Sequence, residues 1–281
     1  MVETLSQAAE QLVRAGVRGS LPWEGFTLST HFQPVYCVER GGCTGYEALV
    51  RAVNADGSSL DSDRLFAEVP AERSLLLDWV CRALHLRNFA TVDKGNRILF
   101  INVDPRAAVA DAEGAQAFAN LVRYYGLTTN RLCVEILEKD CHDEGLLQEA
   151  VCAYREFGAM IAMDDYGVGR SNLDRVVALR PDIVKVDRSL LANAIGNTKA
   201  RAMLPAVAQT LHHAGCKVGV EGVESATEAL LAIEAGADYL QGNYFAAPAP
   251  ALPDESLTGR IFAELVRVQT TPRRLVSVGN A

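Results

Sequence analysis

The chain lacks any long hydrophobic run. No apolar stretch in its 281 residues approaches the ~20 residues that a helix needs to cross a bilayer. The first residues, MVETLSQAAEQLVRAG, carry acids where a secretory signal peptide would have basic residues followed by an apolar segment. We therefore expect a protein without a membrane span and with a cytoplasmic location.

Closely spaced disulfide or zinc motifs are also missing. The seven cysteines are scattered and include no C-x-x-C pair, so we expect reduced thiols. None of the five histidines lies at zinc-ligand spacing from another histidine or from a cysteine. The sequence therefore argues against a disulfide framework and against a structural zinc site.

Basic residues are too few for a nucleic-acid-binding surface. Lys and Arg number 27 against 35 Asp and Glu, which gives a formal net charge of −8. Non-specific binding to long nucleic acid depends on cationic side chains that neutralise phosphates, so we expect none. A small phosphodiester is compatible with an acidic protein if divalent cations lie between its carboxylates and the phosphate.

The order of strand-like and helix-like segments predicts a barrel. Two β-rich runs, residues 26–39 and 43–53, flank the turn signal Arg40-Gly41-Gly42 and predict a hairpin. Six short apolar runs then alternate with amphipathic stretches, as βα units require. Together these features predict an α/β protein, a TIM-type (β/α)8 barrel with an antiparallel N-terminal strand hairpin.

No Pro/Gly/Ser-rich linker divides the chain, so we expect one main domain. We place the barrel at residues 26–267, with its last helix at 254–267. A helical extension is expected at residues 1–25 and a loose tail at 268–281.

Polar residues stand near the carboxyl ends of nearly all the predicted strands. They are Glu47, Asn102, Glu135, Asp164 with Asp165, Lys185, Glu221 and Gln241. Barrels of this type place their active site at this end of the strands, so these side chains should meet in one pocket. Five carboxylates would repel one another there unless cations neutralise them, and oxygen donors favour Mg²⁺ or Mn²⁺ over zinc. The adjacent aspartates suit two cations that share one bridging carboxylate.

Each acid also has an ordinary explanation when it is taken singly. A helix cap or a surface position accounts for most acids in proteins; Glu135 could begin a turn, and Lys185 could pair with Asp187 at a strand edge. The recurrence at one end of successive strands is what favours a functional pocket.

Eight motifs in order resemble the EAL domains, a family of cyclic di-GMP phosphodiesterases. The resemblance spans about residues 26 to 250 and rests on FQPVY, EALVR, FINV, VEILE, DDYGVG, DIVKVD, EGVE and QGNYF. It implies hydrolysis of cyclic di-GMP to linear 5′-pGpG by a water activated by two divalent cations, Mg²⁺ or Mn²⁺. The alternative is a catalytically weak or inactive receptor for cyclic di-GMP that signals through a regulatory protein partner. The resemblance also implies a homodimer.

The resemblance assigns roles to individual residues. The first cation would be held by Glu47, Asn102, Glu135 and Asp164, and the second by Asp164, Asp165 and Glu221. Lys185 would orient the attacking water, and Glu221 could be a ligand or the general base. Substrate contacts would come from Gln33, the backbone near Leu49, Arg51 and Gln241, while Glu138 and Glu224 would brace the loop after the aspartate pair.

The sequence departs from the family at a few positions. Val168 and Arg170 replace the usual Thr and Tyr, and Asn243 replaces a usual Tyr. Ala52 stands where the family commonly has Trp, and residues 54–76 are an atypical version of a family segment. We therefore expect a changed loop after the aspartate pair and a changed wall on the substrate side.

Overall fold

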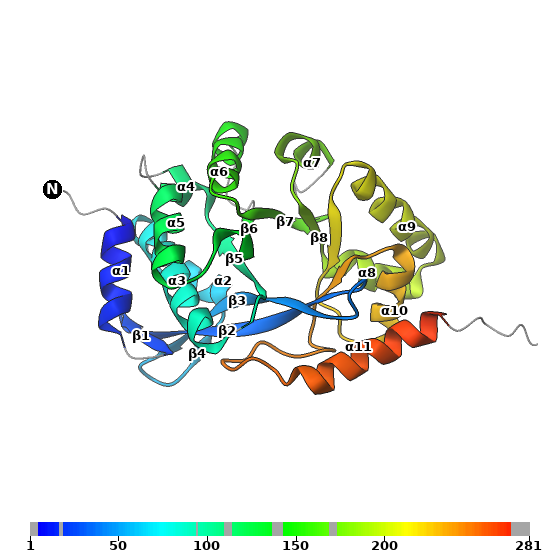
Figure 1. Cartoon of the computed structure of the whole chain (residues 1–281), viewed down its shortest axis with the longest axis horizontal. Helices are drawn as coiled ribbons and strands as arrows, with labels where there is room; N and C mark the ends of the chain where they lie inside the picture. Colours follow the sequence, from blue (N-terminus) through cyan, green and yellow to red (C-terminus); the bar gives the residue numbers. More distant parts are fainter. Residues whose placement is uncertain are drawn as a thin grey trace, which may run out of the picture.

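The computed structural model describes residues 5–16, 19–93, 95–109, 114–136, 143–168 and 173–270 (Figure 1). The helices are α1 (Leu5–Ala15), α2 (Ser62–Glu68), α3 (Ala71–Val92), α4 (Pro105–Val109), α5 (Gly114–Tyr124), α6 (Glu144–Glu156), α7 (Leu173–Leu179), α8 (Arg188–Gly196), α9 (Thr198–His213), α10 (Ala226–Ala235) and α11 (Glu255–Thr270), with a 3-10 turn η1 at Thr129–Arg131. The strands are β1 (Ser20–Trp23), β2 (Phe26–Cys37), β3 (Gly42–Asn54), β4 (Ser59–Leu60), β5 (Ile98–Val103), β6 (Leu132–Ile136), β7 (Met160–Tyr166), β8 (Ile183–Val186), β9 (Lys217–Val220) and β10 (Tyr239–Leu240). No helix within these ranges has the length and apolar character needed to cross a bilayer.

Eight of the strands close into a barrel. Their order is β2-β10-β9-β8-β7-β6-β5-β3, and β3 pairs with β2 to complete the ring. β2 runs antiparallel to both of its neighbours, whereas the other neighbouring pairs of the ring are parallel. The predicted TIM-type barrel and its antiparallel hairpin are therefore confirmed, and β4 extends the sheet beside β3.

The N-terminal segment is only partly the helix that the sequence predicts. Helix α1 packs against α3, but residues 20–23 form strand β1, which pairs with the start of β2. Glu24 and Gly25 make the turn between them, with φ of 46° and 89°. Two residues with positive φ join strands in the tightest hairpins, and Gly25 adopts this conformation without strain. Within the helical extension predicted at residues 1–25, residues 20–23 are therefore a strand rather than a helix. At the other end, α11 continues to Thr270, and residues 271–281 of the predicted tail lie outside the described ranges.

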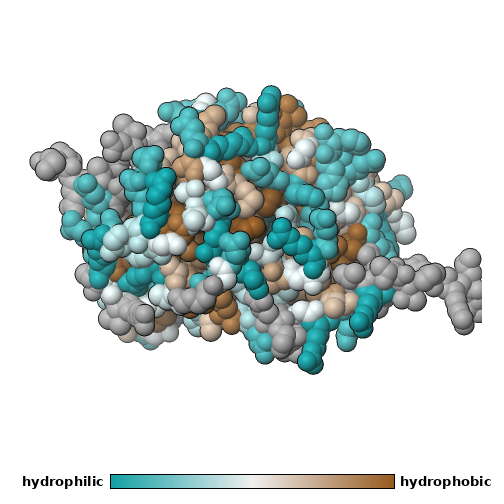
Figure 2. Space-filling view, in the orientation of Figure 1, coloured by the Kyte–Doolittle hydropathy of each residue, from teal (hydrophilic) through white to brown (hydrophobic). Residues whose placement is uncertain are grey.

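The barrel interior and its helical coat form separate apolar layers. Inside the barrel, Val35, Phe100, Cys133, Ala162 and Ile183 pack together as one layer. Larger clusters lie between the strands and the surrounding helices. Figure 2 shows hydrophilic residues over much of the surface, with hydrophobic ones visible near the middle of this face. The interior layer forms a floor on which the next residues of each strand stand.

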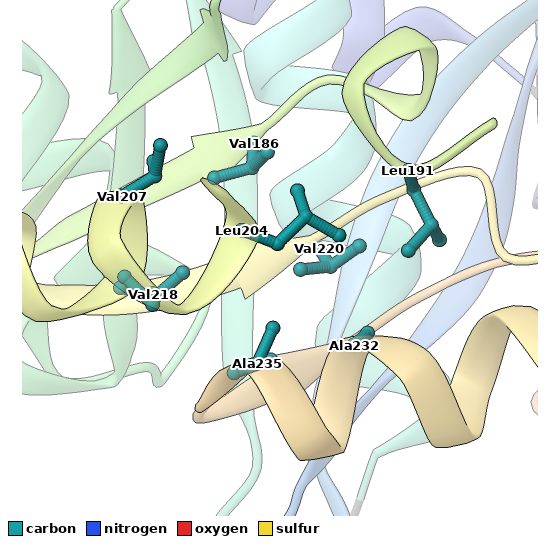
Figure 3. Close-up of a pocket in the computed structure, with 10 residues that line it drawn as sticks. Val186, Leu191, Leu204, Val207, Val218, Val220, Ala232 and Ala235 are labelled. Carbon is teal, nitrogen blue, oxygen red and sulfur yellow. The ribbon is translucent and has the colours of Figure 1, made fainter. Parts of the chain in front are cut away.

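A small apolar cavity lies between β8, β9 and the helices α9 and α10. It measures about 20 Å³, and the side chains of Leu191, Leu204 and Val220 point into it (Figure 3). We expect Leu204→Ala to enlarge this cavity and to lower the free energy of unfolding by about 2–5 kcal/mol. Urea unfolding measures the change, with Met203→Ala, whose side chain is 64% exposed, as the control. Equal losses in both variants would contradict this packing.

Candidate active site

The candidate residues stand directly above the interior layer. Phe100, Cys133, Ala162 and Ile183 belong to that layer, and each is followed two positions later by a polar residue. Because side chains alternate along a strand, residues two apart share a face. The polar residues at these positions are Asn102, Glu135, Asp164 and Lys185. The register places Asn102 beside Glu135 across β5 and β6. One polar layer therefore covers the interior at the carboxyl ends of the strands.

Lys185 lies at the centre of the polar layer. Its Nζ is 2.7 Å from Glu135 Oε1 and 3.7 Å from Glu47 Oε2, and it also pairs with Glu221 Oε1. Lys185 and Glu135 are buried, and Glu221 keeps 24% of its side chain exposed. One ammonium thus bridges acids from three other strands or strand ends.

Glu47 connects this cluster to two amides. Its Oε1 accepts a hydrogen bond from Asn102 Nδ2 at 2.8 Å, and its Oε2 accepts one from Gln241 Nε2 at 2.6 Å. Gln241 Nε2 also donates to Gln33 Oε1 at 3.0 Å. Both glutamines were predicted to touch substrate. Gln241 contacts the predicted cation ligand Glu47 directly, and Gln33 bonds to Gln241 and lies opposite Glu47 on the neighbouring strand.

Burial and mutual repulsion raise the pKa values of two acids of the cluster, Glu135 and Glu221. Burial raises the pKa of Glu135 well above its usual range, and Glu47 and Asp164 raise it further although Lys185 opposes them. Burial likewise raises the pKa of Glu221 well above the usual value against the effect of Lys185, with added repulsion from Asp164. Burial alone would lower the pKa of Lys185, but the surrounding carboxylates raise it well above normal. Lys185 therefore stays charged, whereas Glu135 and Glu221 resist ionisation without a further cation.

The aspartate pair occupies an irregular end of β7. Asp165 has a φ of 53°, and the pairing with β8 shifts between Met163 and Tyr166. The backbone N–H of Asp165 donates to Asp164 Oδ1 at 2.7 Å. A non-glycine residue in this region is strained, and such strain concentrates at functional sites. The irregularity interrupts the regular alternation, by which neighbours on a strand point to opposite faces, at these two residues.

The donor set suits hard divalent cations. It consists of carboxylate and amide oxygens, the ligands that Mg²⁺, Mn²⁺ and Ca²⁺ prefer. Oε2 of the buried Glu135 has no hydrogen-bond partner within the described residues, so it is available to a cation. In the same ranges, no three Asp, Glu, His or Cys side chains form a ready-made cation site. The acids fit a cation chemically, but their side chains are arranged around Lys185.

A pocket of about 580 Å³ adjoins the cluster. Asn102 and Asp164 line it on the side of the polar layer, and Leu49 and Arg51 line it along β3. Pockets of 300–1,000 Å³ are typical of small-ligand sites. The predicted substrate residues on β3 therefore face the same space as two predicted cation ligands.

Of the two predicted bracing residues, Glu224 lies within the part of the chain that the structure describes. Glu224 is exposed and pairs with Arg188 at the start of α8. Glu138 and Arg170 lie outside the described residues. Glu135 does not begin a turn, because it is a fully buried residue of β6. Lys185 does not pair with Asp187 at a strand edge. Asp187 instead caps α8 by accepting a hydrogen bond from Ser189 N at 2.9 Å, while Lys185 pairs inward.

Several pocket residues were not predicted individually. Asp104 and Arg106 form an ion pair at the pocket, and Asp78 accepts a hydrogen bond from Asp104 N at 3.1 Å. Helix α2 adds Phe66 to the wall. The one available signal was the atypical segment at residues 54–76, which was expected to alter the substrate side and which does line this pocket.

Comparison with known proteins agrees with this arrangement. The model of the EAL domain family matches residues 20–248. The signaling protein YkoW of Bacillus subtilis is 28% identical over 253 residues, which are 88% of this chain and 31% of YkoW. The probable cyclic di-GMP phosphodiesterase PdeB of Escherichia coli is 26% identical over 238 residues, 83% of this chain and 44% of PdeB. The chain thus spans 31% and 44% of the lengths of these two relatives.

A solved structure shows the same fold. The Bacillus subtilis YkuI protein, with an EAL domain, was crystallised in complex with substrate c-di-GMP and calcium. It superposes with a TM-score of 0.74 and 25% sequence identity, over 86% of this chain and 60% of YkuI.

Proposed function

The chain belongs to the EAL domain family, and on this premise we propose that it is a divalent-cation-dependent phosphodiesterase that hydrolyses cyclic di-GMP to linear 5′-pGpG. The observation that carries the proposal is the buried cluster of Glu47, Glu135, Lys185 and Glu221 beside a pocket of ligand size. Relatives named as cyclic di-GMP phosphodiesterases and the c-di-GMP and calcium bound by YkuI support it.

Two cations, Mg²⁺ or Mn²⁺, would be held by the residues that the family pattern assigns. These are Glu47, Asn102, Glu135 and Asp164 for the first, and Asp164, Asp165 and Glu221 for the second. When bound, the cations would neutralise the carboxylates and supply Lewis acidity toward water and phosphate oxygens. The positive charge of the cations would then offset the free-energy cost of burying Glu135 and Glu221 in their ionised forms.

Lys185 would contribute a fixed positive charge. Its raised pKa keeps the proton on Nζ, so the ammonium can donate hydrogen bonds to the attacking water and to a phosphate oxygen. Water adds across one P–O3′ bond of the ring, and the leaving 3′ oxygen takes up a proton. The product carries a 5′-phosphate at one end and a free 3′-hydroxyl at the other, as in pGpG.

The substrate would lie in the pocket between the polar layer and helix α2. Arg51 and Arg106 line this space, and their planar groups suit phosphate oxygens or the acceptor edge of guanine. Gln33 and Gln241 would border the substrate from the other side of Glu47.

A second candidate is a receptor that binds cyclic di-GMP with little or no turnover. Two observations favour it: the described acids form no ready-made cation site, and Val168 replaces the usual Thr in the loop after the aspartate pair. The two candidates share the ligand but differ in whether cations complete the site.

Cation binding should stabilise the protein more strongly as pH rises. The pKa values of Glu135 and Glu221 are raised, so the unfolded chain, with glutamates near ~4.3, ionises first and metal-free stability falls as pH rises above that value. Cations favour the ionised acids and reverse this loss. The difference in Tm with and without Mn²⁺ should therefore be larger at about pH 8 than at about pH 5. A difference that shrinks with pH would contradict these shifts.

The ligand assignment can be tested separately from turnover. Calorimetry of the chain with cyclic di-GMP in Ca²⁺ should show binding, because Ca²⁺ coordinates the same oxygens but fits a tight catalytic pair poorly. Cyclic di-AMP is the matched control, and it should bind more weakly because it lacks the guanine edges. Equal affinity for cyclic di-GMP and cyclic di-AMP, or no binding of either, would overturn the substrate assignment.

A further inference from the structure

The first turn of α8 touches both turns that follow the predicted ligands of the second cation. Asp187 N donates to Tyr166 O at 3.2 Å, one residue after Asp165. A Cβ added to Gly167, which has a φ of 99°, would lie 2.4 Å from Leu190 Cδ1. On the other side, α8 meets Gly222, the residue after Glu221. One short segment thus supports two strand ends that are separate in the sequence.

The stem of Arg188 lies directly on Gly222. A Cβ at Gly222, which has a φ of 62°, would be 2.8 Å from Arg188 Cβ and 3.0 Å from its Cγ. Only glycine permits this approach with this backbone conformation. Glu221 N, the last amide before the turn, donates to Val186 O at 3.3 Å. The direction in which Glu221 leaves β9 therefore depends on how this turn is held.

The head of Arg188 fixes the other end of the same turn. Its guanidinium pairs with Glu224, and the N–H groups of Glu224 and Ser225 donate to Glu228 Oε2 at 2.6 and 3.1 Å. The segment from Glu221 to Ser225 is held between β9, Arg188 and the start of α10. The side chains of Arg188 and Glu224 are 47% and 45% exposed, so their pairing adds little to global stability. Its effect should be local.

We propose that Arg188 is a positioning residue: with Glu224 it clamps the Glu221–Gly222 turn and thereby orients the Glu221 carboxylate toward the second cation. The inference rests on the proposed function, because it takes Glu221 as a cation ligand. It gives Glu224 a partner and a role beside Glu221.

The direction in which Arg188→Glu changes Mn²⁺ affinity distinguishes a positioning role of Arg188 from a simple effect of its charge. Arg188→Glu adds negative charge near the cluster, which by electrostatics alone would strengthen cation binding. Loss of the clamp has the opposite effect, because partners that orient metal ligands typically change metal affinity by about 10–100-fold. We expect Arg188→Glu and Glu224→Arg each to weaken Mn²⁺ binding within that range, measured by calorimetry without substrate.

The charge-swapped double variant and a remote pair complete the experiment. Arg188→Glu with Glu224→Arg restores an ion pair and should recover most of the lost Mn²⁺ affinity. Arg201 and Glu234, paired at 3.0 Å and 55% and 40% exposed, provide the matched control, whose swaps should leave Mn²⁺ affinity unchanged. Tighter Mn²⁺ binding by Arg188→Glu, no recovery in the double variant, or equal losses in the control would each overturn the proposal. Wild-type protein that binds Mn²⁺ but forms no pGpG would reject hydrolysis and leave this inference standing.

Discussion

Glu47→Gln is expected to lower the rate of pGpG formation by at least about a hundredfold, because even residues that only orient metal ligands cost 10–100-fold. Glu47 is bound at once by Asn102, Gln241 and Lys185, so its loss affects the whole polar layer. A glutamine keeps the size of the side chain but removes the charge that a cation requires. Chromatography of the nucleotides at saturating Mn²⁺ measures the effect.

Glu47→Gln should lower activity without lowering the Tm of the metal-free protein. Metal-free Glu47→Gln should melt at or above the wild-type Tm, since one of several mutually repelling carboxylates is gone. Its gain in Tm on addition of Mn²⁺ should be smaller. Glu149→Gln, at an exposed position of α6, is the control and should behave as wild type in both respects. Full activity in Glu47→Gln would remove the basis for a cation at this cluster.

Lys185→Met is expected to lose most of the rate while it retains cation and ligand binding. The same substitution should lower the metal-free free energy of unfolding by about 3–5 kcal/mol, since it leaves buried carboxylates without their counter-charge. Mn²⁺ should restore much of this stability by supplying positive charge in place of the ammonium. Denaturant unfolding with EDTA and with Mn²⁺ measures both values.

A surface lysine on the neighbouring strand provides the control for this test. Lys217 pairs with Asp238 at 2.8 Å, but its side chain is 54% exposed. Lys217→Met should change stability by only about 0–1 kcal/mol and should leave the rate unchanged. If Lys185→Met were equally stable in EDTA and in Mn²⁺, Lys185 would not be the charge that holds the cluster together.

The polar layer was predictable because it follows a simple rule of strand geometry. Residues such as Asn102, Glu135 and Lys185 each interrupt an apolar strand near its carboxyl end, and parallel strands bring those ends together. The eight motifs then ordered them within a known family. Central placement of Lys185 among the acids could not be read from the sequence, since it depends on side-chain directions across four strands.

On the substrate side of the site, the sequence predicted which region of the chain lines the pocket but not the individual residues. Asp78 and Arg82 form a buried pair in α3, and Arg82 Nη1 donates to Tyr154 OH at 2.9 Å. Helix α3 is buried over most of its circumference, so its apolar periodicity does not single out one face. The link from Asp78 to Asp104 at the pocket crosses from a helix to a loop, and spacing along the chain does not encode such a contact.

Two departures from the family pattern, Ala52 and Asn243, have local explanations. Ala52 is fully buried and pairs with Leu60 of β4, so the space beside it is filled by this additional strand. Asn243 Oδ1 accepts a hydrogen bond from Gln33 Nε2 at 3.3 Å. Neither change removes a predicted cation ligand. The exposure of Val168, at 44%, has no explanation within the described residues.

Incubation of the purified protein with cyclic di-GMP and Mn²⁺, with and without EDTA, tests the central claim most directly. We predict that chromatography shows pGpG in the tube with Mn²⁺ and intact cyclic di-GMP in the tube with EDTA. Intact substrate in both tubes, together with binding by calorimetry, would contradict hydrolysis and identify the chain as a receptor.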